Sequence, residues 1–234
     1  MTQGYRIVDL THVLEPGMPM TRSLPRFALW WHSRHAWGDK VSLQAMLITE
    51  HTGTNVDAPR HALPEGRTLD DLPLDLFMGP AVILDLRHVE AMAAITADDI
   101  RQAEAKCSGS IRPGDIVLLM TGFDDRGWET VPSLYDTYLK KRPTISLEAA
   151  EYLVSKGIKA LGSDTHGPDA SGPTLPLHNY LLGQGIILIE ALSNLTEVGA
   201  ERCLFIGLPL RIKGGTGSPV RAVAVTGDLS ALMS

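Results

Sequence analysis

The hydrophobic positions of this chain fall in short runs, and polar segments containing glycine or proline separate them. Short apolar runs with β-branched side chains, bounded by turns such as Gly-Pro or Pro-Gly-Asp, are typical of buried strands. We therefore expect strands at residues 7–10, 41–49, 81–86, 116–120, 158–161, 186–190, 204–208 and 220–225.

Two segments carry the signals of helix ends. Thr96 and Asp99 form the capping-box pattern, a hydroxyl three residues before an acid, and Ser146 opens a second helix that runs to Ser155 and ends at Gly157. Each helix precedes a strand, but the order is not a regular βαβ repeat. The pattern predicts an α/β fold, a single domain with a mixed central sheet.

Residues 11–40 have a different character, because they are rich in proline, methionine, arginine and tryptophan. We expect an irregular arm within residues 1–40, with Trp30, Trp31 and Trp37 close together. Trp30 and Trp31 offer flat apolar surfaces that suit an aryl or indole-derived substrate. The alternative is that the tryptophans form core or subunit contacts.

Composition narrows the classes of partner. The chain has 234 residues, 44% of them hydrophobic, which supports one domain over residues 1–234. Its net charge of −6 without basic runs argues against nucleic acid or an anionic membrane and favours a small-molecule substrate. No apolar segment approaches the ~20 residues of a membrane span, and no signal peptide is evident, so we expect a cytoplasmic protein. Cys107 and Cys203 are expected to be reduced core residues.

Residues 51–61 contain the strongest chemical signal. His51, Asn55, Asp57 and His61 place two imidazoles, a carboxamide and a carboxylate beside glycine and proline. These are ligand types for a divalent metal ion. Gly53 and the β-branched neighbours argue against a helix, whereas an extended strand would put residues 51, 55 and 57 on one face. The alternative is a polar turn in which Asn55 and Asp57 bond their own backbone.

A second group of candidates lies downstream. Glu190 ends an apolar run, and a carboxylate there is costly unless it is paired or bound to a cation. His178, which follows Pro176, is its candidate neighbour, although Glu190 could instead emerge at the edge of the sheet. His166 lies in a loop between two acids and is a candidate for substrate binding or simply part of a solvated turn.

Together these residues resemble a known family. The segment 51–61 is similar to the signature H-x-G-T-H-x-D-x-P-x-H of the cyclase family of metal-dependent hydrolases, which includes bacterial kynurenine formamidases and isatin hydrolases. Further similarity runs through residues 9–19, 162–165, 178–192 and 217–222, and so covers nearly the whole chain.

The resemblance implies a fold, a metal centre and an assembly. His51 and Asp57 would be metal ligands, with Asp57 bridging if two ions bind, while His178 and Glu190 would hold the second ion. His61 would be the proton shuttle. The family also implies Zn²⁺ or Mn²⁺, one or two ions, a swivelling β/β/α domain, and a homodimer or homotetramer.

Asn55 departs from the family signature, which has a ligating histidine at this position. A carboxamide oxygen is a weaker and harder ligand than an imidazole nitrogen, and it favours Mn²⁺ over Zn²⁺ or lowers metal occupancy. Asn55 therefore predicts an asymmetric or mononuclear site, a site re-tuned to an oxygen-preferring metal, or a member that has lost hydrolysis.

We expect a hydrolase that cleaves the carbon–nitrogen bond of an amide, formamide or cyclic amide with a metal-activated water. The alternatives are a small-molecule-binding protein with weakened catalysis, or a lyase or dehydratase that uses the same metal. Arg60 and Arg221 could pair with a substrate carboxylate, the other possibility for each being an internal salt bridge.

Overall fold

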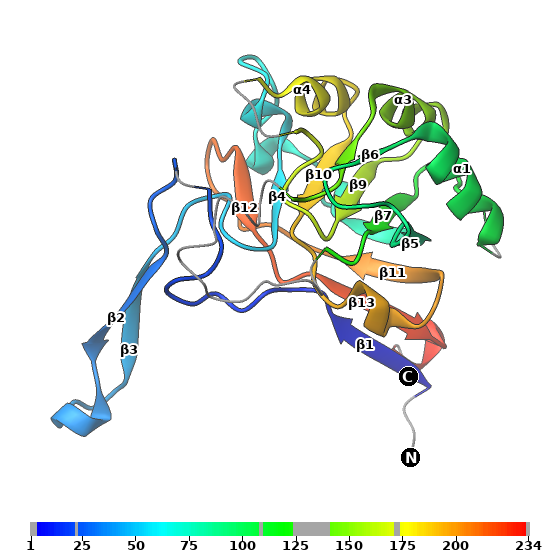
Figure 1. Ribbon diagram of the computed structural model, residues 1–234. Helices are drawn as coiled ribbons and strands as arrows, with labels where there is room; N and C mark the ends of the chain where they lie inside the picture. The colour runs from blue at the N-terminus through cyan, green and yellow to red at the C-terminus, as the bar shows by residue number, and fades with distance from the viewer. Residues whose placement is uncertain (1–3, 22, 108–109, 124–140, 171–173, 233–234) are drawn as a thin grey trace.

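The computed structural model describes residues 4–21, 23–107, 110–123, 141–170 and 174–232. A nine-stranded sheet organises these residues, in the order β1-β13-β11-β5-β7-β9-β10-β4-β12 (Figure 1). The strands are β1 Tyr5–Asp9, β2 Ala28–Ser33, β3 Leu43–Leu47, β4 Asn55–Asp57, β5 Met78–Asp85, β6 Ala94–Ile95, β7 Ile116–Met120, β8 Thr144–Ile145, β9 Ala160–Ser163, β10 Ile187–Glu190, β11 Arg202–Ile206, β12 Gly217–Pro219 and β13 Val223–Gly227. The expected single α/β domain with a mixed sheet is confirmed.

The sheet has a parallel centre and antiparallel flanks. Strands β5, β7, β9 and β10 run parallel, whereas β11, β13 and β1 on one side and β4 and β12 on the other are antiparallel. All five residues of β7 are buried, since both faces of the central strands are covered. This is why the strand reads in the sequence as an unbroken apolar run.

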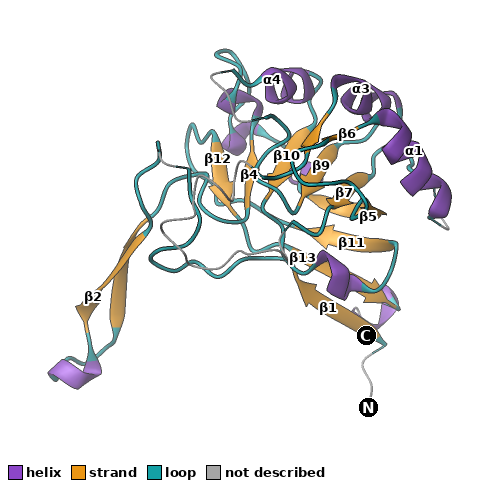
Figure 2. Cartoon of the chain, viewed as in Figure 1, coloured by secondary structure: helices purple, strands orange, loops and turns teal. Residues whose placement is uncertain are grey.

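In the described ranges, three helices cover one face of the sheet (Figure 2): α1 Ala97–Lys106, α3 Leu147–Ser155 and α4 Pro176–Gly183. The predicted capping box is present, because the backbone N–H of Asp99 donates to Thr96 Oγ1 (3.1 Å) and that of Thr96 donates to Asp99 Oδ2 (2.8 Å). Helix α4 was not predicted. It begins with a proline in its first turn and has no capping side chain, so the usual start signal is missing.

The two faces of the sheet carry separate apolar cores. Alternate residues of β7 divide between them: Val117 and Leu119 pack with the helices, while Ile116 and Leu118 pack with Phe205 and the other buried residues of the opposite face. The core on that opposite face contains residues of the flanking strands, such as Val8 and Ala224, and of the 3₁₀ helices, such as Leu69 and Leu195. Both faces of the parallel centre are therefore dry.

Residues 28–47 form a β-hairpin, β2 paired with β3, that projects from the body of the molecule (Figure 1). The expectation of an irregular arm is wrong for this part, because aromatic residues favour strands and the segment Ala28–Ser33 pairs with Leu43–Leu47, with one register shift between Trp31 and Ser33. Trp30, Trp31 and Trp37 are 52%, 37% and 61% exposed, which excludes the core alternative for them.

The remaining short elements connect these parts. The 3₁₀ helices are η1 His35–Trp37, η2 Pro59–His61, η3 Leu69–Asp71, η4 Leu74–Leu76, η6 Leu195–Val198 and η7 Leu229–Leu232. Both cysteines are free; Cys203 is buried and Cys107 half-buried. Within the described ranges, no helix combines the length and apolar character needed to cross a bilayer.

Candidate metal centre

Strand β4 positions the first donors. It lies between β10 and β12, and its register places Asn55 opposite Glu190. Asn55 and Asp57 are two residues apart, so their side chains share one face of the strand, and directly paired residues of antiparallel strands also share a face. The pairing of β4 with β10 thus brings Glu190 to Asn55 and Asp57, from which it is far apart in the sequence.

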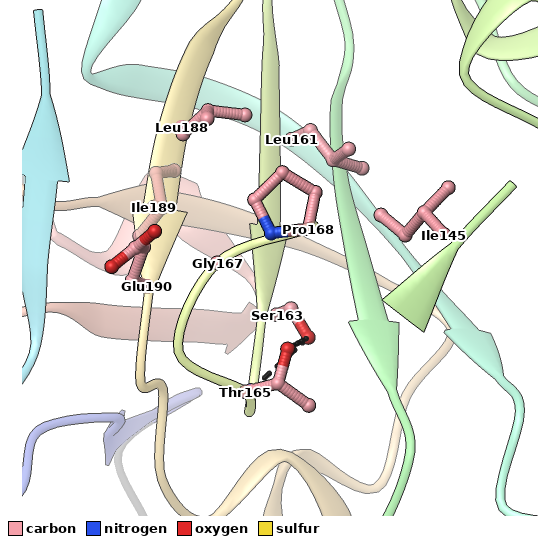
Figure 3. Close-up of a pocket in the computed structure, with 9 residues that line it drawn as sticks. All are labelled: Ile145, Leu161, Ser163, Thr165, Gly167, Pro168, Leu188, Ile189 and Glu190. Carbon is pink, nitrogen blue, oxygen red and sulfur yellow. Dashed lines mark hydrogen bonds between the residues drawn. The ribbon is translucent and has the colours of Figure 1, made fainter. Parts of the chain in front are cut away.

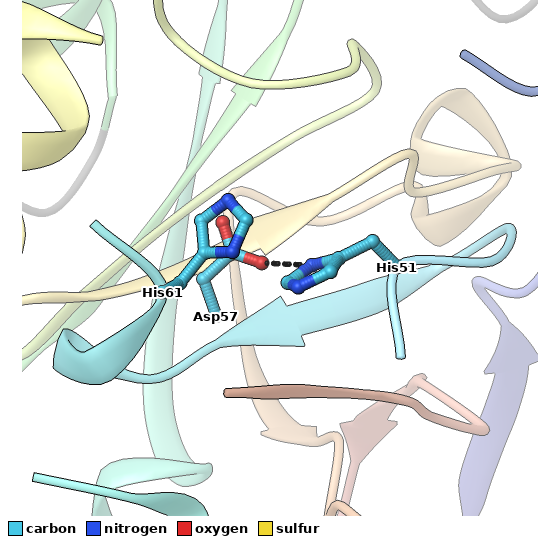
Figure 4. A group of neighbouring side chains, drawn as sticks. All are labelled: His51, Asp57 and His61. Atoms are coloured by element: carbon cyan, nitrogen blue, oxygen red, sulfur yellow. Dashed lines mark hydrogen bonds and ion pairs between the residues drawn. The ribbon is translucent and has the colours of Figure 1, made fainter. Parts of the chain in front are cut away.

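His51 reaches the same place from a turn. The sequence predicts an extended strand from residue 51, but residues 50–54 form a turn. Gly53 has a φ of 64°, which changes the direction of the chain before β4 begins. The turn brings His51 Nδ1 to 2.8 Å from Asp57 Oδ1 (Figure 4) and to 3.3 Å from Asn55 Oδ1. The Nδ2 of Asn55 donates to the Gly53 carbonyl (2.9 Å), which leaves the amide oxygen directed at His51.

His61 stands beside this pair at the end of η2. Its ring lies beside that of His51 (Figure 4), with the two centroids 4.0 Å apart, and its centroid is 5.7 Å from that of His178. Burial lowers the pKa of His61 below its ordinary value of 6.5. The imidazole is therefore neutral at neutral pH and has a lone pair available to accept a proton.

His178 lies in the first turn of α4 and is held by Asp169. The Asp169 carboxylate is 2.5 Å from His178 Nδ1 and accepts the backbone N–H groups of Leu177 (2.8 Å) and His178 (3.0 Å). This fixes the ring so that Nε2 faces Glu190 Oε1 (3.2 Å) and Asp57 Oδ2 (3.6 Å). Asp169 was not predicted, since nothing in the sequence marks an acid nine residues before a histidine as its partner.

The donors form two groups that share one residue. His51, Asp57 and His61 make one group and Asp57, His178 and Glu190 the other, with donor atoms in each within 4.8 Å of one another. Asp57 is fully buried, and its Oδ2 has no hydrogen-bond partner among the described residues. An unsatisfied carboxylate oxygen is costly in such a place. A carboxylate oxygen without a hydrogen bond among the described residues, 3.6 Å from His178 Nε2, and the mixed imidazole and oxygen donors fit a divalent metal ion.

Protons take the place of a cation in the metal-free protein. Burial opposes charge on His178, but its hydrogen bonds to Asp169 and Glu190 outweigh burial and raise its pKa to about 10. Burial likewise opposes charge on His51, but the hydrogen bond and charge of Asp57 raise its pKa. Metal binding at these imidazoles must therefore release protons.

Residues 164–169, a loop segment that precedes α4, lie against the second group. Gly167, with a φ of 76°, lies so close that a Cβ there would be 2.7 Å from Glu190 Oε1. A small cavity lies beside it (Figure 3), lined by Ile145, Leu161, Ser163, Thr165, Gly167, Pro168, Leu188, Ile189 and Glu190. His166 belongs to this loop and is half-buried. A fully solvated turn is therefore excluded for His166.

Two arginines proposed as substrate contacts have partners within the chain. Arg221 pairs with Asp9 (2.9 and 2.5 Å), which is the salt-bridge alternative. Arg60 is exposed and donates to the Pro64 carbonyl, and for both residues a contact with substrate stays a prediction. Trp30 and Trp31 lie on the projecting hairpin, away from the donor groups of their own chain (Figure 1).

The fold is shared with solved hydrolases. An isatin hydrolase bound to the product analogue thioisatinate superimposes with a TM-score of 0.84 and 27% identity, over 96% of this chain and 94% of that one. A structure described as a potential metal-dependent hydrolase with cyclase activity matches with a TM-score of 0.76 and 27% identity, over 96% and 99% of the chains. Fold and site together define a metal-dependent hydrolase.

The chain belongs to the cyclase family, whose sequence model matches residues 8–170. Among curated relatives, the isatin hydrolase of Roseibium aggregatum is 32% identical over 241 residues, which covers 94% of this chain and 91% of the relative. The kynurenine formamidase of Salinibacter ruber is 32% identical over 201 residues, covering 83% and 84%. The resemblance found in the sequence motifs is confirmed, as is the expectation of an amide-cleaving hydrolase.

Proposed function

We propose that this protein hydrolyses the carbon–nitrogen bond of an aryl formamide or cyclic aryl amide, with His51, Asn55, Asp57, His178 and Glu190 as metal ligands. The observation that carries the proposal is the buried Asp57, which both donor groups share and whose Oδ2 lacks a hydrogen-bond partner among the described residues. The names of the relatives, isatin hydrolase and kynurenine formamidase, support the substrate class.

Residues beside the proposed ligands transfer protons and orient the ligands. A divalent ion bound here would supply a Lewis acid able to lower the pKa of a water ligand to ~7. His61, neutral because burial lowers its pKa, accepts a proton from the attacking water and returns it to the leaving nitrogen. Asp169 keeps His178 in one orientation, so that Nε2 always faces the donors.

The direct test is an assay of metal-free protein reconstituted with Mn²⁺ or Zn²⁺. We expect hydrolysis of isatin, N-formylkynurenine or a simple aryl formamide, and we expect it to depend on the added ion. Metal uptake without hydrolysis of any of these amides would favour the binding-protein alternative. A product that has lost water or a leaving group without hydrolysis would favour a lyase.

Asn55 supports a preference for Mn²⁺ over Zn²⁺. Its Nδ2 is held by the hydrogen bond to the Gly53 carbonyl, so that its Oδ1 faces His51 and the other proposed ligands. Replacing Asn55 with histidine is expected to strengthen Zn²⁺ binding by ~10-fold or more, the scale on which ligand-sphere changes act. Competition with a chromophoric chelator measures this affinity. The control is Gln44→His, which adds a histidine on the exposed hairpin; an equal gain in both variants would contradict the role of Asn55.

We also propose a cytoplasmic homodimer or homotetramer held together through the hairpin. An isolated two-stranded hairpin is marginally stable in water, yet this one exposes Trp30, Trp37, Leu43 and Met46. Trp30→Ser combined with Met46→Ser is expected to shift the mass measured by light scattering towards the monomer. Leu147→Ser, at an exposed leucine of α3, is the control and should leave the mass unchanged.

A further inference from the structure

Both nitrogens of His51 face polar atoms. Nδ1 points at Asp57 and Asn55 in the donor cluster, whereas Nε2, on the far side of the ring, lies 3.4 Å from Thr216 Oγ1. The ring is thus held between the donor groups and a hydroxyl contributed from 165 residues further along the chain. A metal-ligating histidine usually donates its second N–H to such a partner.

Thr216 occupies a fixed position just before β12. Its carbonyl accepts the backbone N–H of Ala58 (2.9 Å), which continues the pairing of β12 with β4. Its hydroxyl donates to Glu50 Oε2 (2.5 Å), and its backbone N–H donates to the same oxygen (3.2 Å). Because the hydroxyl hydrogen is committed to Glu50, the oxygen lone pair that faces His51 is available as an acceptor.

The backbone after Thr216 restricts the ring further. A Cβ at Gly217 would overlap His51 Cε1 and lie 2.9 Å from Nδ1, so this position has room only for glycine. The glycine lets the backbone of β12 contact the imidazole directly. One side of the His51 ring therefore packs against β12, and Nε2 faces a hydrogen-bond acceptor.

We propose that Glu50 and Thr216 are positioning residues that hold His51 with its Nε2–H donated to Thr216 and its Nδ1 lone pair presented to the metal. The inference rests on the proposed metal centre and goes beyond its ligand set. It gives His51 the same kind of support that Asp169 gives His178, with a hydroxyl inserted between carboxylate and imidazole. Support from a carboxylate raises the basicity of the ligating nitrogen and fixes its orientation.

The test is metal affinity rather than activity. Metal-free, full-length protein is titrated with Mn²⁺ alone and with Zn²⁺ alone, in competition with a chromophoric chelator. Thr216→Val removes the hydroxyl at nearly constant volume and is expected to raise the Kd by ~10–100-fold. Glu50→Gln should raise it less, since an amide oxygen still accepts the hydroxyl, and Thr216→Ser should restore the wild-type Kd.

Two controls separate positioning from general destabilisation. Thr96→Val removes a similar hydroxyl–carboxylate hydrogen bond, Thr96 Oγ1 to Asp99 Oδ2 (2.6 Å), at the start of α1; it should lower the Tm and leave the Kd unchanged. In a His51→Ala background, Thr216→Val should have no further effect on the Kd, because the residue acts through His51.

A wild-type Kd in Thr216→Val, the same fold-change with and without His51, or wild-type protein that takes up neither ion would each overturn the proposal. Failure of the proposed function looks different. It would appear as normal metal binding without hydrolysis, and the comparison of Kd values would still decide the role of Glu50 and Thr216.

Discussion

Replacing Asp57 with asparagine is expected to eliminate detectable hydrolysis and to weaken metal binding by roughly 100- to 1,000-fold. Asp57 is the one residue common to both donor groups, and it is fully buried. The substitution keeps the shape of the side chain but removes the negative charge that faces His51 and His178. This loss of affinity corresponds to about 3–4 kcal/mol, in the lower part of the range of about 3–5 kcal/mol for removing one partner of a buried charged group.

Metal content of the purified variant, measured by mass spectrometry, and kcat with added Mn²⁺ or Zn²⁺ check this result. The matched control is Asp115→Asn, which removes an equally buried carboxylate that pairs with Arg202 (2.6 Å) outside the donor groups. It should lower the free energy of unfolding and leave metal content intact. An Asp57→Asn variant that retains full metal content and turnover would exclude the shared-ligand arrangement.

His61→Ala is expected to lower kcat by ~10²–10⁴-fold, the range for loss of a general acid–base, with metal content unchanged. The pH profile gives a second signature. Because burial lowers the pKa of His61, and a base must be neutral to act, the rate should rise with pH through a limb below pH 6.5 and then level off. The variant should lose this limb.

The control for His61 is His88→Ala, at an exposed histidine beside Asp99 that should change neither kcat nor metal content. His61 is also close enough to His51 and Asp57 to count as a third donor. Loss of metal together with activity in His61→Ala would therefore assign it as a ligand. Retained turnover would exclude both roles.

The sequence predicts well those elements that carry a clear local signal, such as a run of buried apolar residues or a helix cap. Strand β7 occupies residues 116–120 as expected, because both of its faces are dry and every residue is apolar. Helix α1 starts where its capping box predicts. By contrast, β4 and β12 have three residues each, too few to show a period, and they exist as strands because they pair with each other and with β10.

The donor residues of the site could be named from the sequence, but not the groups that support them. Residues 51–61 lie together in the chain, and Glu190 ends an apolar run in which a carboxylate needs a reason. Glu50 and Thr216 are 166 residues apart. Neither residue is part of a sequence motif with the spacing of metal ligands. Contacts of this kind follow from strand register, which local patterns do not contain.

The arrangement of β4 between β10 and β12 has a mechanical consequence. The donors Asn55 and Asp57 sit on the antiparallel flank, while Glu190 ends the last strand of the parallel centre. An ion held by both would clamp the two regions of the sheet across a strand pairing of only three residues. Removing the ion would then let the flank open as a separate cooperative unit, with backbone amides of β4 exchanging with solvent before those of β7.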